Sequence, residues 1–102
     1  MKLDNFTGGW LVGNFIPSLI KTDAIEVGIK EISAGTTGDG HYHKLITEYT
    51  IILHGHAILN NQEYFKGDII ILKPNEKNYT KFIKDTLILS IKSMSIPDDK
   101  YY

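Results

Sequence analysis

Two histidines and a glutamate lie close together in the middle of this sequence. His41 and His43 are separated by one tyrosine, and Glu48 follows five positions after His43. In a β-strand, residues i and i+2 point to the same face, so we expect both imidazoles on one side of a short strand over 41–43. A turn over 44–47 then brings the Glu48 carboxylate back beside them. Two neutral imidazoles and one carboxylate form a tripod for a first-row divalent metal that leaves coordination positions open.

The tripod lies within a longer pattern of glycines at fixed spacing. Five residues separate Gly35 from His41, and six separate Glu48 from Gly55. This spacing reproduces the first motif of the cupin superfamily, and the stretch 67–75 (GDIIILKPN) resembles the second. The sequence is therefore similar to small single-domain cupins of the RmlC-like type. The resemblance implies an all-β fold, a small double-stranded β-helix or jelly-roll barrel.

The second motif departs from the family pattern at the position of the fourth ligand. Where the resemblance implies a histidine, this sequence has Asn78, followed by Tyr79. Asparagine offers a carbonyl oxygen, and tyrosine binds iron as a phenolate if its pKa is lowered. The resemblance thus implies an open site with three protein ligands, or a cupin that has lost its metal. The expected cofactor is one divalent transition metal, Fe, Mn, Ni or Zn, of which Fe(II) (non-heme iron) and Mn(II) suit these donors.

Further candidate site residues follow from strand alternation around the tripod. Glu48 and Tyr79 are the candidate catalytic residues. The expected substrate-binding residues are Thr50, Ile52, Asn78 and Phe82. Trp10 and Phe15 are assigned to core packing in preference to the cavity wall. His54 and His56 flank the turn glycine Gly55, and we expect both to face solvent at one end of the barrel.

The function that the resemblance implies is metal-dependent chemistry on a small polar metabolite, such as a sugar derivative or an organic acid. Isomerase, lyase and dioxygenase chemistry all remain open. Thr50 stands where some metal-dependent cupin lyases have a catalytic tyrosine, which weakens a lyase reading of that kind. The alternative is a non-catalytic module that binds a small ligand or a metal, because Glu48 is the only evident general base and would be occupied by metal.

Short strands separated by turn signals at regular intervals predict one all-β domain over 1–102. Ile25, Val27 and Ile29 alternate with Glu26, Gly28 and Lys30, which indicates a half-buried strand with a period of two. Turns are predicted at His54-Gly55, Asn60-Asn61, Gly67-Asp68 and Lys84-Asp85. The first of these is expected to close a hairpin, and the last is expected to join 79–83 and 86–91 in another. The polar tail 97–102 is left either loose or docked through its tyrosines.

Composition narrows the functional classes. The 102 residues include no cysteine, which excludes disulfides and zinc–thiolate sites. All eleven basic residues are lysine and the net charge is −1, so nucleic acid is not an expected partner. No apolar run is long enough to span a bilayer and the N-terminus lacks a secretory signal, so we expect no membrane partner and a cytoplasmic location. A thin core and open edge strands predict a homodimer, with 10–15 and 88–96 as the candidate edges.

Overall fold

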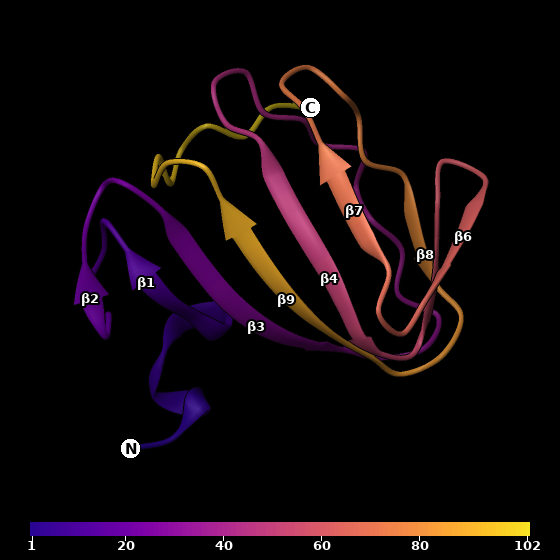
Figure 1. The fold of residues 1–102 in the computed structure, drawn as a ribbon, viewed down its shortest axis with the longest axis horizontal. Coiled ribbons are helices and arrows are strands. Elements are labelled where there is room, and N and C mark those ends of the chain that lie inside the picture. The colour runs from indigo at the N-terminus through magenta and orange to yellow at the C-terminus, as the bar shows by residue number, and fades with distance from the viewer.

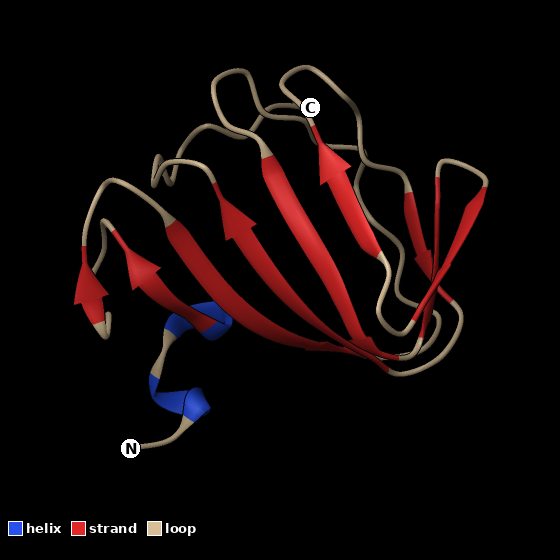
Figure 2. Ribbon diagram, viewed as in Figure 1, coloured by secondary structure: helices blue, strands red, loops and turns tan.

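The computed structural model describes all residues 1–102 and confirms the all-β prediction. Two short 3-10 turns, η1 (Leu3–Asn5) and η2 (Thr7–Gly9), precede nine strands. The strands are β1 (Trp10–Gly13), β2 (Ile20–Lys21), β3 (Glu26–Ile32), β4 (Glu48–His54), β5 (His56–Leu59), β6 (Gln62–Phe65), β7 (Ile69–Leu72), β8 (Thr80–Phe82) and β9 (Thr86–Lys92). Helical turns are confined to the N-terminal segment beneath β1 (Figure 2). No helix has the length and apolarity that crossing a membrane would require.

The strands form two sheets that enclose one core. The large sheet has the order β2-β1-β3-β9-β4-β7, and the small sheet has the order β6-β5-β8. Figure 1 shows the large sheet curving across the molecule, with β6 and β8 facing it beyond β7. The buried apolar cluster between them consists of Ile52, Ala57, Leu59, Ile70, Leu72 and Ile88.

Two of the predicted hairpins are wrong, for one topological reason. β8 pairs with β5, whereas β9 lies between β3 and β4, so the turn at 84–85 carries the chain from the small sheet to the large one. The link at Gly55 makes the same kind of crossing between β4 and β5. Gly55 has φ +113°, and a Cβ there would lie 2.5 Å from the Thr86 hydroxyl. Alternation within a strand does not reveal such crossings, because both kinds of turn have the same composition.

The turn at Asn60-Asn61 is confirmed. β5 and β6 are antiparallel neighbours, with Leu59 opposite Gln62. Asn60 and Asn61 both have positive φ, 48° and 68°. Positive φ at both central residues is the geometry that a two-residue hairpin requires and that asparagine tolerates.

The inner face of the large sheet changes from charged to apolar along its strands. Three cross-strand rows succeed one another: Glu26–Lys92–Glu48, Gly28–Ser90–Thr50 and Lys30–Ile88–Ile52. The predicted half-buried strand is confirmed as β3, and its polar positions face inward: Glu26 is 3% exposed, whereas Ile25, just before the strand, is 43% exposed. β3 turns Glu26, Gly28, Lys30 and Ile32 inward, and Val27 and Ile29 outward.

The outer face of the same sheet is apolar. Val27–Ile91–Tyr49–Ile71 and Ile29–Leu89–Ile51–Ile69 form two cross-strand rows on it. Ile69 is 58% exposed and Ile71 is 51% exposed. The edges of this sheet are β2 and β7, so the predicted edge segments 10–15 and 88–96 are wrong: β1 and β9 each have a neighbour on both sides.

Candidate metal centre

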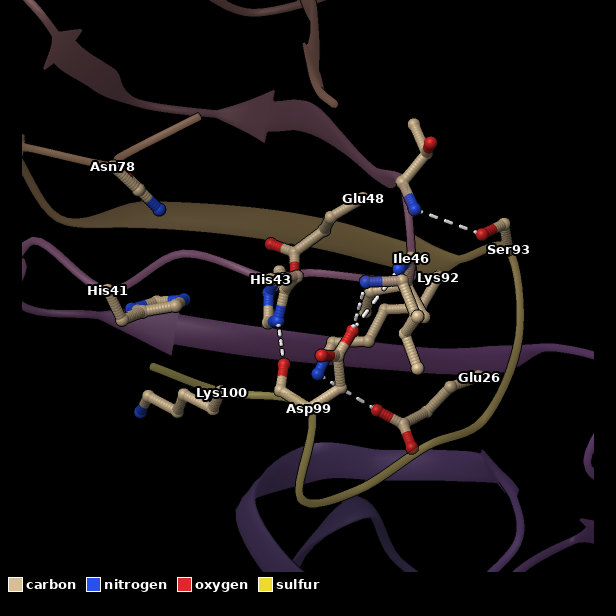
Figure 3. A network of polar contacts seen from close by, with 12 residues as sticks. Glu26, His41, His43, Ile46, Glu48, Asn78, Lys92, Ser93, Asp99 and Lys100 are labelled. Atoms are coloured by element: carbon tan, nitrogen blue, oxygen red, sulfur yellow. Dashed lines mark hydrogen bonds and ion pairs between the residues drawn. The ribbon is translucent and has the colours of Figure 1, made fainter. Parts of the chain in front are cut away.

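His43 is held in one orientation by the C-terminal segment. Its side chain is buried, and its Nδ1–H donates a hydrogen bond to the backbone carbonyl of Asp99. This bond leaves the lone pair on Nε2, which is how imidazole ligands of metals are usually prepared. Nε2 is buried without a hydrogen-bond partner and lies 3.4 Å from Oε1 of Glu48. A ligand-ready nitrogen therefore faces a carboxylate oxygen at close range (Figure 3).

The Asp99 side chain anchors the loop that carries this histidine. Its carboxylate accepts hydrogen bonds from the backbone N–H groups of Lys44, Leu45 and Ile46 at 3.1, 2.9 and 3.2 Å. Burial raises the pKa of Asp99, but these three donors outweigh it, so the pKa is below its usual value. The C-terminal tail is thus docked, and a segment some fifty residues away in sequence positions the ligand.

A second contact ties the same tail to the residue between the histidines. The backbones of Tyr42 and Tyr101 exchange two hydrogen bonds, of 2.8 and 2.9 Å. This isolated bridge replaces the short strand predicted over 41–43, which is wrong as a strand. The expectation that both imidazoles share a side is met, because the rings of His41 and His43 lie 5.2 Å apart between centroids in an edge-to-face arrangement.

His41 has its own orienting partner. Its Nδ1 lies 2.7 Å from Oδ1 of Asp39, a neighbour in the same loop. That hydrogen bond lowers the pKa of Asp39 to about 2. With Nδ1 engaged, Nε2 is again the nitrogen left for a ligand. Both histidines of the tripod therefore carry an oxygen partner on the far ring nitrogen.

Glu48 remains ionised in a buried setting because charges surround it. Burial raises its pKa, but His43, Lys92 and Lys30 together lower it below its usual value. Glu48 also raises the pKa of His43; burial of the imidazole opposes this and the Asp99 carbonyl supports it. The two groups therefore stabilise each other's charged forms, and together they offer one nitrogen and one carboxylate to a cation.

A buried ion pair borders the tripod. Nζ of Lys92 lies 3.0 Å from Oε2 of Glu26, whose other oxygen accepts a hydrogen bond from the Ser95 hydroxyl at 2.9 Å. Lys92 occupies the row between Glu26 and Glu48. Sequence reasoning missed Glu26, Lys30, Lys92 and Asp99. The sequence signal that could have found Glu26, Lys30 and Lys92 was the polar side of β3 and β9, where these residues lie at every second position.

Two adjoining cavities meet at the tripod. The mouth has a volume of about 440 Å³ and contains the tripod, with Trp10 and Phe15 in its wall. Trp10 and Phe15, which were assigned to core packing, thus also line the cavity. The inner cavity, of about 180 Å³, lies between the sheets. Lys30, His41 and Glu48 line both cavities and so mark the junction between them.

The predicted substrate-binding residues line the inner cavity. They are Thr50, Ile52, Asn78 and Phe82. Asn78 points from its loop toward the side where His41 and Glu48 lie (Figure 3), and its amide oxygen accepts a hydrogen bond from the Thr80 hydroxyl. An engaged amide oxygen is a poor replacement for a fourth ligand.

Tyr79 does not belong to this site. It is 58% exposed and lines an outer groove beside Asn60. Because Asn78 and Thr80 face the inner cavity, the residue between them points the other way. The assignment of Tyr79 as a catalytic residue is therefore wrong in this structure.

The remaining histidines also lie outside the cavities of the tripod. His54 ends β4 and lines a separate surface hollow, exposed as predicted. His56 is less exposed than predicted, because its ring stacks on Phe65 at 4.4 Å between centroids and its Nε2 lies 3.2 Å from Glu63. Neither imidazole joins the tripod.

The tripod fits a metal by its chemistry but is not closed. Nowhere in the structure are three His, Asp or Glu side chains grouped tightly enough to hold an ion between them. The Nε2 of His43 and the carboxylate of Glu48 already face each other, so His41 is the ligand that must approach. The donors present are those that Fe, Mn, Ni and Zn accept.

Comparison with known proteins identifies the fold. No protein-family model and no curated protein matches the chain. Among solved structures, KdgF from Halomonas sp. superposes with a TM-score of 0.66 over 76% of this chain and 74% of its own, at 16% identity. A cupin protein from Bacteroides fragilis gives a TM-score of 0.56 over 78% and 73%, at 22% identity.

A third structure extends over more of the chain. The DMSP lyase DddQ from Ruegeria pomeroyi gives a TM-score of 0.74 over 90% of this chain at 14% identity. This chain spans about half of that protein, 48% of its length. The protein therefore has a jelly-roll fold with a candidate ligand set at its mouth. Its fold is that of a small cupin.

Proposed function

We propose that this protein is a metal-dependent cupin that acts on a small polar metabolite at His41, His43 and Glu48. The observation that carries the proposal is the Nε2 atom of His43. It is buried, lacks a hydrogen-bond partner and lies 3.4 Å from a Glu48 oxygen. A buried polar atom without a partner costs about 1–3 kcal/mol, so such an atom calls for an explanation.

A shared cation accounts for this arrangement. Two acceptors that face each other repel unless a proton or a metal ion lies between them. The Asp99 carbonyl fixes the hydrogen of His43 on Nδ1, which turns the lone pair of Nε2 toward Glu48. A proton satisfies only these two groups, whereas a metal ion also explains why His41 lines the same mouth with its Nδ1 engaged by Asp39.

The chain's own residues supply binding and exclusion of water. A bound divalent metal supplies Lewis-acid polarisation of a carbonyl or acidification of a water molecule. Thr50 and Ser90 add hydroxyl groups to the inner cavity, and half of the residues in its wall are hydrophobic. An organic acid or a sugar derivative fits this lining. Isomerase, lyase and dioxygenase reactions are each compatible with an open metal position.

One reaction class has a structural relative. Structures of DMSP lyases superpose with TM-scores of 0.74 and 0.73, at 14% and 20% identity. Because one fold carries many reactions, this similarity is an analogy and leaves the substrate of the present chain undefined. Thr50 remains an argument against a lyase with a catalytic tyrosine at that position.

A non-catalytic ligand-binding cupin is the second candidate, and the position of Tyr79 favours it. With Tyr79 directed outward, Glu48 is the only member of the predicted acid–base pair at the cavity. A carboxylate that binds metal is not free to move a proton. Turnover would then depend on a group other than those predicted from the sequence.

We also propose that the protein is a homodimer through the outer face of the large sheet. Its two apolar rows leave Ile69 and Ile71 more than half exposed. Exposed apolar patches of this kind mark interaction sites. A second copy is the occupant that this face fits, because a two-fold axis brings the same apolar patch of two subunits against itself.

Metal analysis tests the main proposal. Protein purified without chelator is expected to contain, or to take up, close to one equivalent of Fe, Mn, Ni or Zn. His43→Ala is expected to abolish uptake, and His54→Ala is the matched control. Uptake below about a tenth of an equivalent by the unmodified protein, or equal loss in both variants, would refute the site. An enzyme is expected to turn over a metabolite, and this turnover is expected to disappear in Glu48→Ala. A non-catalytic binding module is instead expected to be thermally stabilised by a ligand without turning it over.

A further inference from the structure

Lys30 is the cation of the cavity without a fixed partner. Lys92 is paired with Glu26 at 3.0 Å and Lys100 with Asp39 at 3.6 Å. The Lys30 side chain forms neither an ion pair nor a hydrogen bond to a carboxylate. Its Nζ lies 4.4 Å from the centre of the Trp10 ring, which Lys92 also approaches at 4.6 Å, and Lys30 lines the cavity.

The position of Lys30 places this charge where the two cavities join. Lys30 lines both the mouth and the inner cavity, as His41 and Glu48 do. Its backbone lies in the deep row with Ile88 and Ile52, whereas its Nζ lies over the ring of Trp10, a residue of the mouth. A ligand at the junction therefore meets an ammonium group on one side and the tripod on the other.

The charges at the mouth indicate what such a ligand carries. Three lysines line it, and two of them are paired with carboxylates, Lys92 with Glu26 and Lys100 with Asp39. The charges left over are the Lys30 ammonium and the Glu48 carboxylate. Burial lowers the pKa of Lys30 and Glu48 opposes this shift. A divalent cation bound by Glu48 takes up that carboxylate, and an anionic group beside Lys30 then restores the balance.

The inner cavity indicates the remainder of the ligand. Its volume is about 180 Å³, and eight of the sixteen lining residues are hydrophobic, Ile32, Ile52 and Phe82 among them. An apolar cavity of about 150 Å³ takes up benzene, so a branched alkyl group or a small ring fits here. One ammonium without a salt-bridge partner and no arginine in the chain favour a singly charged carboxylate over a phosphate, which requires more donors.

We infer that the protein binds a small monocarboxylate, with the carboxylate held by Lys30 at the junction and a compact apolar group in the inner cavity. This inference rests on the proposed function for its reaction, because the bound carboxylate lies beside the tripod. The binding step itself uses Lys30 and the cavity wall, and it can be measured with or without metal.

Tryptophan fluorescence tests the inference directly. Trp10 is the only tryptophan, and the Lys30 ammonium stacks on its ring, so a carboxylate at Lys30 alters the emission. The probes are 3-methylbutanoate, its neutral amide 3-methylbutanamide, and inorganic phosphate, each titrated into metal-free and zinc-loaded protein. We expect saturable binding of 3-methylbutanoate, with the amide and phosphate at least tenfold weaker.

Variants identify the residue responsible. Lys30→Met is expected to weaken 3-methylbutanoate binding at least tenfold, and Lys30→Arg to retain most of it. Lys66→Met, at an exposed lysine between β6 and β7, is the matched control and is expected to bind normally. Circular dichroism establishes that each variant is folded. Equal binding of acid and amide, tighter binding of phosphate, or unchanged binding by Lys30→Met would overturn the inference.

The same titrations distinguish this inference from the proposed function. Calorimetric zinc binding by wild type and Lys30→Met reports on the tripod alone. Protein that binds 3-methylbutanoate through Lys30 but binds no metal would refute the metal centre and leave the carboxylate site standing. Protein that binds zinc but shows no preference for the carboxylate would refute the carboxylate site and leave the metal centre standing.

Discussion

Asp99→Asn removes the charge that anchors the histidine loop while it preserves the size of the side chain. The Asp99 carboxylate accepts three backbone hydrogen bonds of 2.9–3.2 Å, and the residue is 3% exposed. Hydrogen bonds to charged groups contribute about 1.5–3 kcal/mol each, against about 1 kcal/mol for neutral ones. The asparagine oxygen retains two of the three donors at the lower value, and its NH₂ group opposes the third.

We therefore expect Asp99→Asn to lower the free energy of unfolding by about 2–4 kcal/mol. For a domain of this size, the melting temperature falls by about 10–20 °C. Urea unfolding at pH 7 measures the first quantity and calorimetry the second. Asp98→Asn is the matched control, because Asp98 is an exposed neighbour whose carboxylate forms no hydrogen bond or ion pair in the structure. It is expected to change stability by less than about 0.5 kcal/mol.

Acid pH provides an independent check on the cause. The pKa of Asp99 is lowered in the folded protein, so its contribution is present above about 3.8 and is lost as the pH falls through the folded-state value. The stability difference between wild type and Asp99→Asn is thus expected to narrow below pH 3.8. Because Asp99 also orients His43, metal affinity is expected to fall about 10–100-fold. Equal stability of the two Asn variants at pH 7 would refute the anchoring role.

Three further predictions concern the site and the outer face. Zinc affinity is expected to fall about tenfold per pH unit below the raised pKa of His43, since the imidazole must lose its proton to bind; calorimetry from pH 5 to 8 measures this, and a flat profile would contradict it. Gly28→Ala is expected to cost about 1–3 kcal/mol and to shift the emission of Trp10, because the new Cβ would lie 2.6 Å from its ring; unchanged emission would contradict the packing. Ile71→Lys is expected to convert a dimer to a monomer in analytical ultracentrifugation, whereas Lys81→Met on the small sheet leaves the dimer intact; a monomeric wild type would refute the interface.

The strands were largely predictable and their partners were not. Alternation over 26–32 and the β-branched run over 48–54 mark strands directly, because a pleated strand imposes a period of two. Which sheet a strand joins depends on long-range pairing. The turns at Gly55 and 84–85 therefore resembled hairpin turns although the chain crosses between sheets at both.

The half-buried strand β3 could be predicted, but the side that faces inward could not, because the hydrophobic pattern has two explanations. Apolar positions of a half-buried strand usually face the core. Val27 and Ile29 instead form part of the apolar outer face, and the inner face holds Glu26 and Lys30. A sheet that is apolar on one side and lines a polar cavity on the other shows the same alternation as a sheet packed on a core.

The tripod was found from local spacing, and the residues that orient it could not be. His41, His43 and Glu48 lie within eight positions, so strand geometry is enough to group them. Asp99 reaches His43 from 56 residues away, and no short pattern encodes that contact. Tyr79 was misassigned because a gap-free alignment does not reveal which neighbour faces inward.

The row Glu26–Lys92–Glu48 suggests how one mouth would accommodate both the proposed metal and the inferred carboxylate. Lys92 pairs with Glu26 at 3.0 Å, so Glu48 is shared between His43 and the more distant field of Lys92 and Lys30. When a divalent cation binds Glu48, the carboxylate no longer balances the charge of the nearby lysines. Lys92 and Lys100 keep their own carboxylate partners, so Lys30 is the ammonium left without one. Metal binding is therefore expected to strengthen 3-methylbutanoate binding, and the carboxylate to strengthen zinc binding by the same factor. Titration of each in the presence of the other measures this coupling, and independent binding would show that Glu48 does not link the two sites.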